Sequence, residues 1–181
     1  MRVWSIGHST HPFDEFVGLL QMNGVERIAD VRTVPKSLRN PQFHTGSLAT
    51  TLPAAGIGYV HLERLGGWRK AEPDSPNDGW HNKSFRGYAD YTLTDGFAAG
   101  LAELETLAED TPTAMMCSEA LWWRCHRRLV ADRIVHQGGE VLHIAGNGTT
   151  APRELTRFAV VDPHGRLVYP EAGDGPGDAI A

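Results

Sequence analysis

The sequence has few cysteines, no long apolar run and no excess of positive charge. Two cysteines among 181 residues are too few for the disulfide framework of a small secreted protein. No segment approaches the roughly 18 apolar residues that a membrane-spanning helix needs, and residues 1–13 lack the apolar stretch of a secretory signal peptide. We therefore expect a cytoplasmic protein with no membrane partner, whose cysteines are free thiols or metal ligands.

The charge balance is acidic, with 17 Lys and Arg residues against 22 Asp and Glu residues, a net charge of -5. This excludes a protein whose main role is to coat nucleic acid nonspecifically, because such proteins are basic. A local basic segment is still present, since residues 124–133 contain four arginines and one acid. The apolar share of 41% is typical of a soluble globular chain, which at this length can bury a core without disulfides.

Short apolar runs alternate with segments of helical periodicity along most of the chain. Strands are expected at residues 3–6, 25–31, 58–62, 113–117 and 140–144. Helices are expected at residues 13–20, 47–55, 88–109 with a break at 95–96, and 126–136. This order predicts a three-layer α/β protein with a mostly parallel sheet and a C-terminal β-hairpin at 158–169.

Two segments depart from this alternation. Residues 64–85 form an irregular, aromatic-rich loop that we expect to be an ordered lid. Its aromatic residues flank cations, so it can clamp bases or be anchored by its own rings. We expect residues 1–170 to form a single α/β domain and residues 171–181, rich in Gly and Asp, to be a disordered tail.

Polar side chains follow four of the predicted strands. The carboxyl ends of parallel strands share one edge of a sheet, and ligands bind in the crevice outside that edge. The residues concerned are His8 and Ser9, Asp30 and Arg32, Cys117 and Glu119, and His143. We therefore expect a polar pocket at this edge.

Cys125 immediately precedes the last predicted helix. The partial positive charge of a helix start, together with His126 and Arg127, favours a thiolate and the binding of an anion. In this interpretation Cys125 is the nucleophile and Glu119 the general acid or base. Cys117 is a third catalytic candidate, although a cysteine on an apolar strand is equally expected to pack in the core.

The remaining candidates bind substrate. Arg32 and Arg127 are expected to hold anionic groups, and His126 lies beside them in the same segment. His8 and Ser9 are expected to orient the substrate; alternatively, Ser9 or Thr10 caps the following helix. Asp30 and Arg32 point to one face of their strand, where they form an internal ion pair or contact the substrate.

Several short motifs resemble those of the domain-of-unknown-function 488 family. They are Ile6-Gly7-His8-Ser9, Asp30-Val31-Arg32 with Pro35 and Ser37, Gly56-Ile57-Gly58-Tyr59, Leu65-Gly66-Gly67, and Met116-Cys117-Ser118-Glu119 leading to Cys125-His126-Arg127. They span about residues 6–144 in the family's order. The resemblance implies a Rossmann-like α/β fold and no established reaction. The spacer Ala120-Leu121-Trp122-Trp123-Arg124 is more aromatic than is usual in the family.

These observations lead to one hypothesis and two alternatives. The hypothesis is an enzyme that acts on a small anionic substrate, a nucleotide or phosphorylated metabolite, through the cysteine pocket. The first alternative is a non-enzymatic module that binds nucleic acid or nucleotides. The second is a metal-dependent enzyme with Cys117, Cys125 and His126 as ligands, joined by His8 or His143. The sequence leaves any cofactor unknown. Trp122 and Trp123 are expected to stack a planar ligand or to form a homodimer interface.

Overall fold

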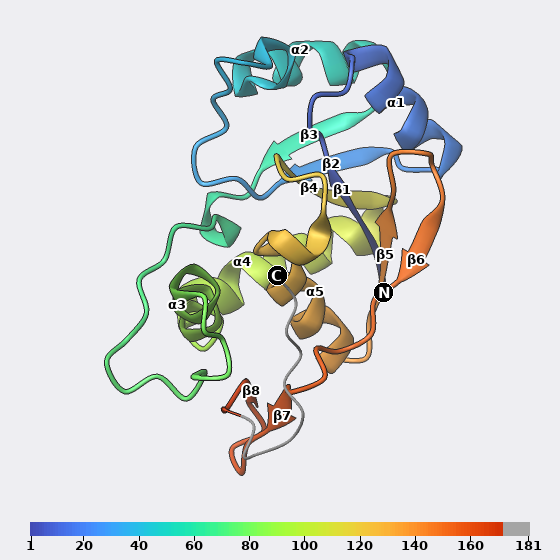
Figure 1. Cartoon of the computed structure of the whole chain (residues 1–181). Coiled ribbons are helices and arrows are strands. Elements are labelled where there is room, and N and C mark those ends of the chain that lie inside the picture. The colour runs from blue at the N-terminus through green and yellow to red at the C-terminus, as the bar shows by residue number, and fades with distance from the viewer. Residues whose placement is uncertain (172–181) are drawn as a thin grey trace.

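A computed structural model describes residues 1–171 of the chain (Figure 1). Its centre is a six-stranded sheet in the order β3-β2-β4-β1-β5-β6. All neighbours are parallel except β5 and β6. The strands are β1 (Arg2–Gly7), β2 (Arg27–Asp30), β3 (Gly58–His61), β4 (Thr113–Cys117), β5 (Glu140–Ile144) and β6 (Thr150–Pro152). A separate antiparallel pair, β7 (Val160–Val161) and β8 (Leu167–Val168), follows. The predicted α/β class, mostly parallel sheet and C-terminal hairpin are confirmed.

Five α-helices connect the strands: α1 (Phe13–Met22), α2 (Thr45–Ala54), α3 (Lys83–Tyr91), α4 (Asp95–Asp110) and α5 (Arg127–His136). The break expected at 95–96 in the predicted helix at 88–109 is real but lies at residues 92–94, between α3 and α4. There the Thr94 hydroxyl caps α4 by accepting from the Phe97 N–H. Asn82 caps α3 in the same way.

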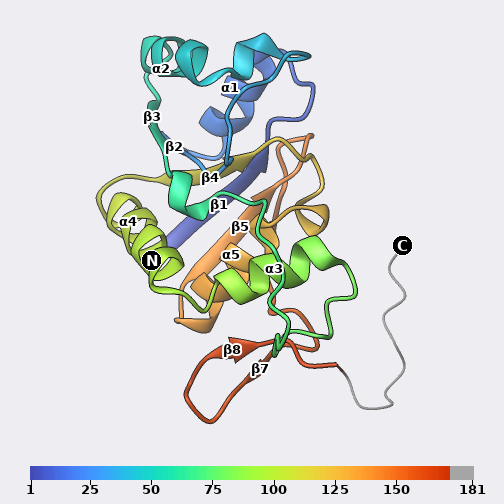
Figure 2. The same cartoon turned by 90° about the vertical axis from the view of Figure 1, so that its left-hand side faces the viewer.

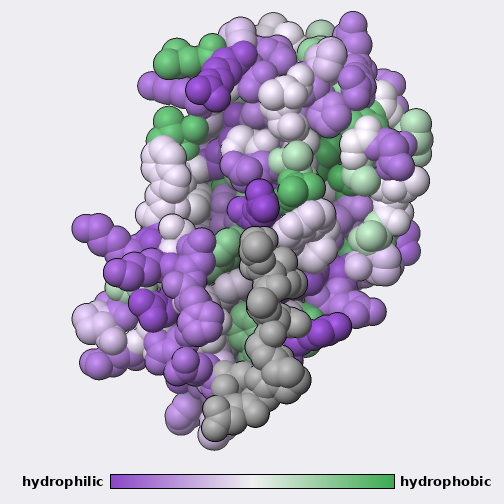
Figure 3. Space-filling view, in the orientation of Figure 1, coloured by the Kyte–Doolittle hydropathy of each residue, from purple (hydrophilic) through white to green (hydrophobic). Residues whose placement is uncertain are grey.

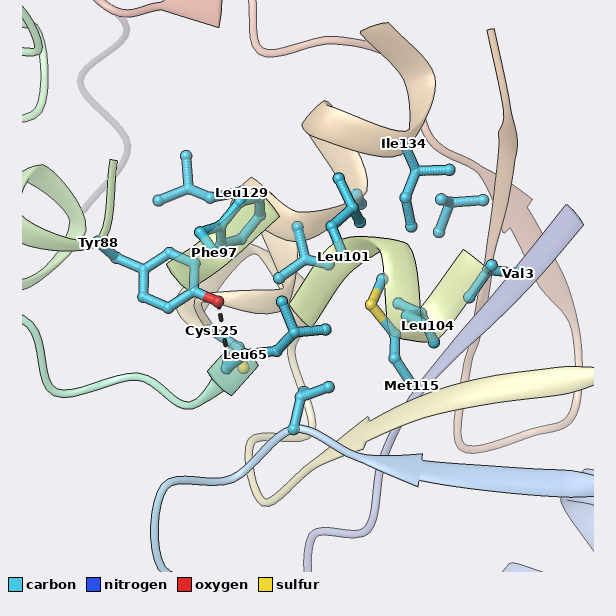
Figure 4. Packing of buried hydrophobic residues seen from close by; sticks show 14 of the residues in the cluster. Val3, Leu65, Tyr88, Phe97, Leu101, Leu104, Met115, Cys125, Leu129 and Ile134 are labelled. Carbon is cyan, nitrogen blue, oxygen red and sulfur yellow. Dashed lines mark hydrogen bonds between the residues drawn. The ribbon is translucent and has the colours of Figure 1, made fainter. Parts of the chain in front are cut away.

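The sheet is covered on both faces, which gives three layers (Figure 2). Successive side chains of a strand point to opposite faces of the sheet. Ile6 and Ile28 pack on one face, in a cluster with residues of α1 and α2. Val3 and Met115 point the other way, into a cluster with α3, α4 and α5. Figure 4 shows this second cluster, with Cys125 beside Leu65 and close to the Tyr88 ring.

The connections of β1 and β4 create a crevice between these neighbouring strands. The chain leaves β1 for α1 on one face of the sheet, and leaves β4 for α5 on the opposite face. Two hydrogen bonds prolong the pairing beyond the strands, from the His8 N–H to the Cys117 carbonyl and from the Ser9 N–H to the Ser118 carbonyl. A switch point of this kind is where open α/β sheets bind ligands.

Two elements differ from expectation or lie outside it. The edge strand β6 was not predicted, because three exposed residues ending in a proline carry no apolar pattern. The expected tail at 171–181 lies outside the described residues except for Glu171. Within residues 1–171, none of the helices combines the length and apolar character needed to cross a bilayer.

The segment at 64–85 is ordered. Trp80 is buried, stacks on Phe85 at 5.0 Å between ring centroids, and also contacts Phe158 and Tyr169. The buried Asp90 carboxylate accepts hydrogen bonds from the Ser75 hydroxyl and from the Asn77 side chain. Trp80, Ser75 and Asn77 therefore fix this part of the segment on α3, which is one of the two roles expected for the loop.

Candidate functional site

A cavity of about 970 Å³ opens at the carboxyl ends of β1, β2 and β4. Its volume is at the upper end of the range for small-molecule sites. The walls come from four segments: the turn after β1, the loop after β2, the 66–68 segment with the start of α3, and the loop between β4 and α5. Of the predicted site residues, those that line the cavity are His8, Ser9, Arg32, Cys117, Glu119, Cys125 and His126. Asp30 and Arg127 lie behind the wall, which differs from the expectation that Arg127 contacts a ligand.

Cys125 lies at the floor of this cavity and is 3% exposed. Burial alone raises the pKa of its thiol. The hydrogen bond from the Cys117 thiol and the charge and N–H groups of Arg127 act in the opposite direction and bring that pKa down to about 6. The thiolate is therefore the main form of Cys125 at neutral pH.

Arg127 is a fully buried cation that has no carboxylate partner. Its guanidinium donates to Cys125 Sγ at 3.3 Å, to the Ser5 hydroxyl at 3.1 Å and to the Glu119 carbonyl. None of the ion pairs found within residues 1–171 includes it. An unpaired buried charge costs several kcal/mol, so the Cys125 thiolate is the anion that balances this cation.

Cys117 ends β4 and remains a neutral thiol. Its hydrogen bond to Cys125 and its burial raise its pKa to about 12. It packs in the core, as one interpretation of the sequence expected, and it also serves the site by donating its proton toward the Cys125 sulfur.

His126 faces the cysteines and does not point away from the cavity. The ring Nε2 lies 2.9 Å from the Val31 carbonyl, so it carries the proton and donates. The other nitrogen, Nδ1, lies 3.7 Å from Cys125 Sγ and can serve as a metal ligand. The Cys117 and Cys125 sulfurs and one His126 nitrogen all lie within 4.8 Å of one another.

The second wall is built by a chain of buried polar contacts. Arg32 forms a bidentate pair with Asp30, at 2.8 and 2.5 Å, and also donates to the Phe43 carbonyl. Its remaining nitrogen lies 3.1 Å from Nε2 of His8, which accepts. Most donors of Arg32 are thus used inside the protein. Asp30 and Arg32 do share a face, and their contact is the internal ion pair.

His8 is held in one tautomer by these contacts. Because Nε2 accepts from Arg32, Nδ1 carries the proton and donates to the Ser9 carbonyl at 2.9 Å. The ring stacks on Phe43 at 4.2 Å between centroids. Burial, aided by the charge of Arg32, lowers the pKa of His8 to about 4, so the ring is neutral near pH 7.

Glu119 and the mouth of the cavity remain accessible. The Glu119 side chain is exposed and forms none of the hydrogen bonds or ion pairs found within residues 1–171. Lys36, Arg39 and Arg124 also line the cavity and add positive charge at its mouth. The sequence places Lys36 and Arg39 only in a solvated loop, since their position over the pocket depends on how that loop folds back.

The backbone is strained at two points of this cavity. Ser9 has a φ of 47° and Trp68 a φ of 58°, the two positive values found for non-glycine residues within 1–171. Both residues line the cavity. Left-handed backbone at a non-glycine residue carries an energetic cost and is concentrated at functional sites.

Trp122 has a role inside the protein. Its ring stacks on His143 at 4.3 Å, and the Arg153 guanidinium lies 4.8 Å from its centre. His143 is buried behind the site and does not line the cavity. The adjacent Trp123 is 40% exposed and lies outside the cavity.

Sequence reasoning missed three residues that support the site. They are Ser5, which accepts from Arg127, Tyr59, whose hydroxyl donates to Asp30 at 2.8 Å, and Tyr88, whose ring lies 4.9 Å from that of His126. A serine inside an apolar strand was the one local signal available for Ser5. The roles of the two tyrosines depend on packing between distant segments.

Comparison with known proteins gives one match. The model of the family described as Domain of unknown function DUF488 matches residues 12–134, about two thirds of the chain, which include Asp30, Arg32 and the Cys117–Arg127 segment. No curated protein and no solved structure matches. The chain belongs to the DUF488 family.

Proposed function

We propose that this protein is an enzyme that attacks a small anionic substrate, a nucleotide or phosphorylated metabolite, with the Cys125 thiolate. The observation that carries the proposal is the buried Arg127 guanidinium, whose Nε donates to the Cys125 sulfur at 3.3 Å. Maintaining a buried ion pair is costly. Cys125 lines the cavity, which is the position that an activated nucleophile requires.

The other residues have distinct roles in this proposal. Glu119, free at the cavity wall, moves a proton to the leaving group or from water. Neutral His8 and the strained Ser9 turn orient the substrate, and Lys36, Arg39 and Arg124 attract its negative charge. Cys117 and Arg127 are positioning residues, since both act through the Cys125 sulfur. The chemistry requires a reducing compartment such as the cytoplasm, because the nucleophile is a free thiol.

Alkylation by iodoacetamide across a pH series tests the nucleophile, with mass spectrometry to locate the adduct. Reaction at Cys125 should rise with pH through a midpoint of about 6, and Cys117 should remain unmodified. Arg127→Met should raise the midpoint, and a midpoint higher by about one pH unit means about tenfold less thiolate at any pH below it. Arg133→Met is the matched control, because Arg133 is a second buried arginine of α5 that contacts Thr92 and the Leu167 carbonyl instead. A Cys125 midpoint near that of an ordinary thiol, about 9, rejects the proposal.

A metal centre is the second candidate, and a separate observation favours it. Nε2 of His126 donates to the Val31 carbonyl, which leaves Nδ1 facing the Cys125 sulfur, and the two sulfurs and one nitrogen of this ring lie within 4.8 Å of one another. Histidine ligands of zinc are commonly held by such a hydrogen bond. His8 is an unsuitable fourth ligand because both of its nitrogens have partners. A three-ligand site that opens to a cavity is the catalytic type, with water or substrate as the fourth ligand.

Metal analysis of protein purified without a histidine tag separates the two candidates. The metal candidate predicts about one zinc per chain, and loss of that zinc in His126→Ala. With zinc bound, Cys125 is a ligand and no longer a free nucleophile. The thiolate proposal predicts no retained metal and no thiolate-to-metal absorption band on adding Co²⁺.

A further inference from the structure

Four cations gather beside the active-site cavity in a protein whose net charge is -5. A second cavity of about 500 Å³ is lined by Arg69, Lys70, Lys83 and Arg86, with Glu72 as the one acidic residue of its lining. Arg86 also pairs with Asp78, which lies outside the lining, at 3.5 Å. Ser84 lines both cavities, and Trp68 in the first is followed directly by Arg69 in the second. The two hollows are therefore adjacent. Hydrophilic residues, purple in Figure 3, cover the part of this face formed by α3 and the segment before it.

Trp68 stands out among the aromatic residues of this region. Trp80 is buried and Phe85 packs against it, so both anchor the segment. Trp68 is 83% exposed, and none of the ring contacts found within residues 1–171 involves it. The left-handed backbone that holds this ring at the cavity mouth carries an energetic cost, and such strain is concentrated at functional sites. A partner with a flat face that stacks on the indole explains why it is there.

The cationic segment is held rigidly. A Cβ at Gly87 would come within 2.5 Å of the Arg69 carbonyl, so the 69–71 backbone lies directly against α3. The Arg69 guanidinium lies 3.7 Å from the centre of the Tyr91 ring and donates to the Gly66 carbonyl. The Glu72 N–H donates to the Asp90 carboxylate. Preorganised cations lose little entropy when an anion binds.

The geometry points to a single-stranded nucleic acid as the partner of this surface. We propose that the phosphates of the strand lie along Arg69, Lys70, Lys83 and Arg86, while one base stacks on Trp68 at the mouth of the first cavity. Alternating cations and exposed aromatic rings bind single strands in this way. The cations that line the second cavity give this surface a local positive charge, which allows a protein of net negative charge to bind a nucleic acid strand. Entry of the stacked nucleotide into the Cys125 cavity rests on the proposed function, whereas binding of the strand does not.

Fluorescence anisotropy with a labelled oligonucleotide of about ten nucleotides tests the proposal on the full chain. We expect binding at low salt that weakens as salt rises. Trp68→Ala should lower the affinity about 5- to 150-fold, the effect of losing one stacked base. Lys70→Ala and Lys83→Ala should each reduce the salt slope by about 0.7. Trp123→Ala and Arg2→Ala are matched controls, because Trp123 and Arg2 are exposed and lie outside both cavities.

The outcomes separate this proposal from neighbouring ones. Absence of binding at low salt, or an affinity that Trp68→Ala leaves unchanged, overturns it. Equal competition by inorganic polyphosphate, which has no bases, would show a general polyanion site and also overturns it. Cys125→Ser should bind the strand as the parent does, so a failure of the cysteine chemistry leaves this result intact.

Discussion

At the scale of single residues, His143 is a buried imidazole whose protonation opposes folding. Neither ring nitrogen has a hydrogen-bond partner among residues 1–171. Burial, together with the charges of Arg127 and Arg153, lowers its pKa from 6.5 to about 3. The folded state therefore binds fewer protons than the unfolded state between these two pKa values. Protonation of His143 costs the folded state no stability above pH 6.5, and it lowers the free energy of unfolding progressively as the pH falls from 6.5 toward 3.

Replacing His143 with leucine should remove part of the acid sensitivity. The free energy of unfolding falls between pH 7 and pH 4, and we expect this fall to be about 3 kcal/mol smaller in His143→Leu than in the parent protein. Stability at pH 7 should change by less than this, because the substitution loses no hydrogen bond within the described chain and leucine replaces the imidazole against the Trp122 ring. Urea unfolding at both pH values measures this, with the exposed His164→Leu as control. An unchanged acid sensitivity would contradict the assignment.

At the scale of elements, the site depends on how closely the loop after β4 crosses the end of β1. A Cβ on Gly7 would lie 1.9 Å from the Glu119 carbonyl oxygen and 2.6 Å from its carbon. Real Cβ atoms do not approach backbone so closely, so a side chain here must move the loop. The same carbonyl accepts from Arg127, and a displaced loop therefore also disturbs the cation behind Cys125.

Gly7→Ala should accordingly destabilise the protein by more than about 2 kcal/mol, since overpacking costs about 1–3 kcal/mol and a buried charge contact is weakened as well. It should also raise the pH midpoint of Cys125 alkylation. Gly18→Ala is the matched control, because nothing lies within 4 Å of a Cβ there and alanine favours its helix by about 0.5–1 kcal/mol. Thermal unfolding measures the stability of both variants, and the alkylation assay measures the pH midpoint of Cys125. Equal stability of Gly7→Ala and Gly18→Ala would contradict the close approach of the Glu119 carbonyl to Gly7.

At the scale of the whole molecule, one buried carboxylate joins α5 to the C-terminal segment. Asp132 is fully buried and accepts from Arg153 at 2.6 Å, from the Thr156 hydroxyl at 2.7 Å and from the Tyr169 hydroxyl at 3.0 Å. Arg153 and Tyr169 lie on either side of the β7–β8 pair in sequence. This side chain therefore holds the end of the described chain on the helix that carries Arg127.

Asp132→Ala should lower the free energy of unfolding by about 3–5 kcal/mol, because it leaves the buried Arg153 without its counter-ion. Glu103→Ala is the control. It breaks the exposed Arg64–Glu103 pair at 3.6 Å and should change stability by less than about 1 kcal/mol. Both values follow from urea unfolding, and similar effects of the two substitutions would show that the buried network contributes little.

The sequence by itself determined the order of strands and helices, the parallel character of the sheet and the residues at its carboxyl edge. Local signals suffice for these features, because apolar periodicity, caps and strand ends are properties of neighbouring residues. The short, polar β6 carried no such signal. Cys125 was singled out because it precedes a helix, a feature that can be read along the chain.

Tertiary structure alone decided which of those residues share an environment. Cys117 and Cys125 come within reach of each other, and of the His126 ring, only when β4 and α5 meet. The guanidinium of Arg127 turns inward to the thiolate, whereas that of Arg32 pairs with Asp30, although the sequence suggested the same anion-binding role for both. The physical reason is that pKa values, ion pairs and exposure depend on distances between segments remote in sequence, which periodicity does not contain.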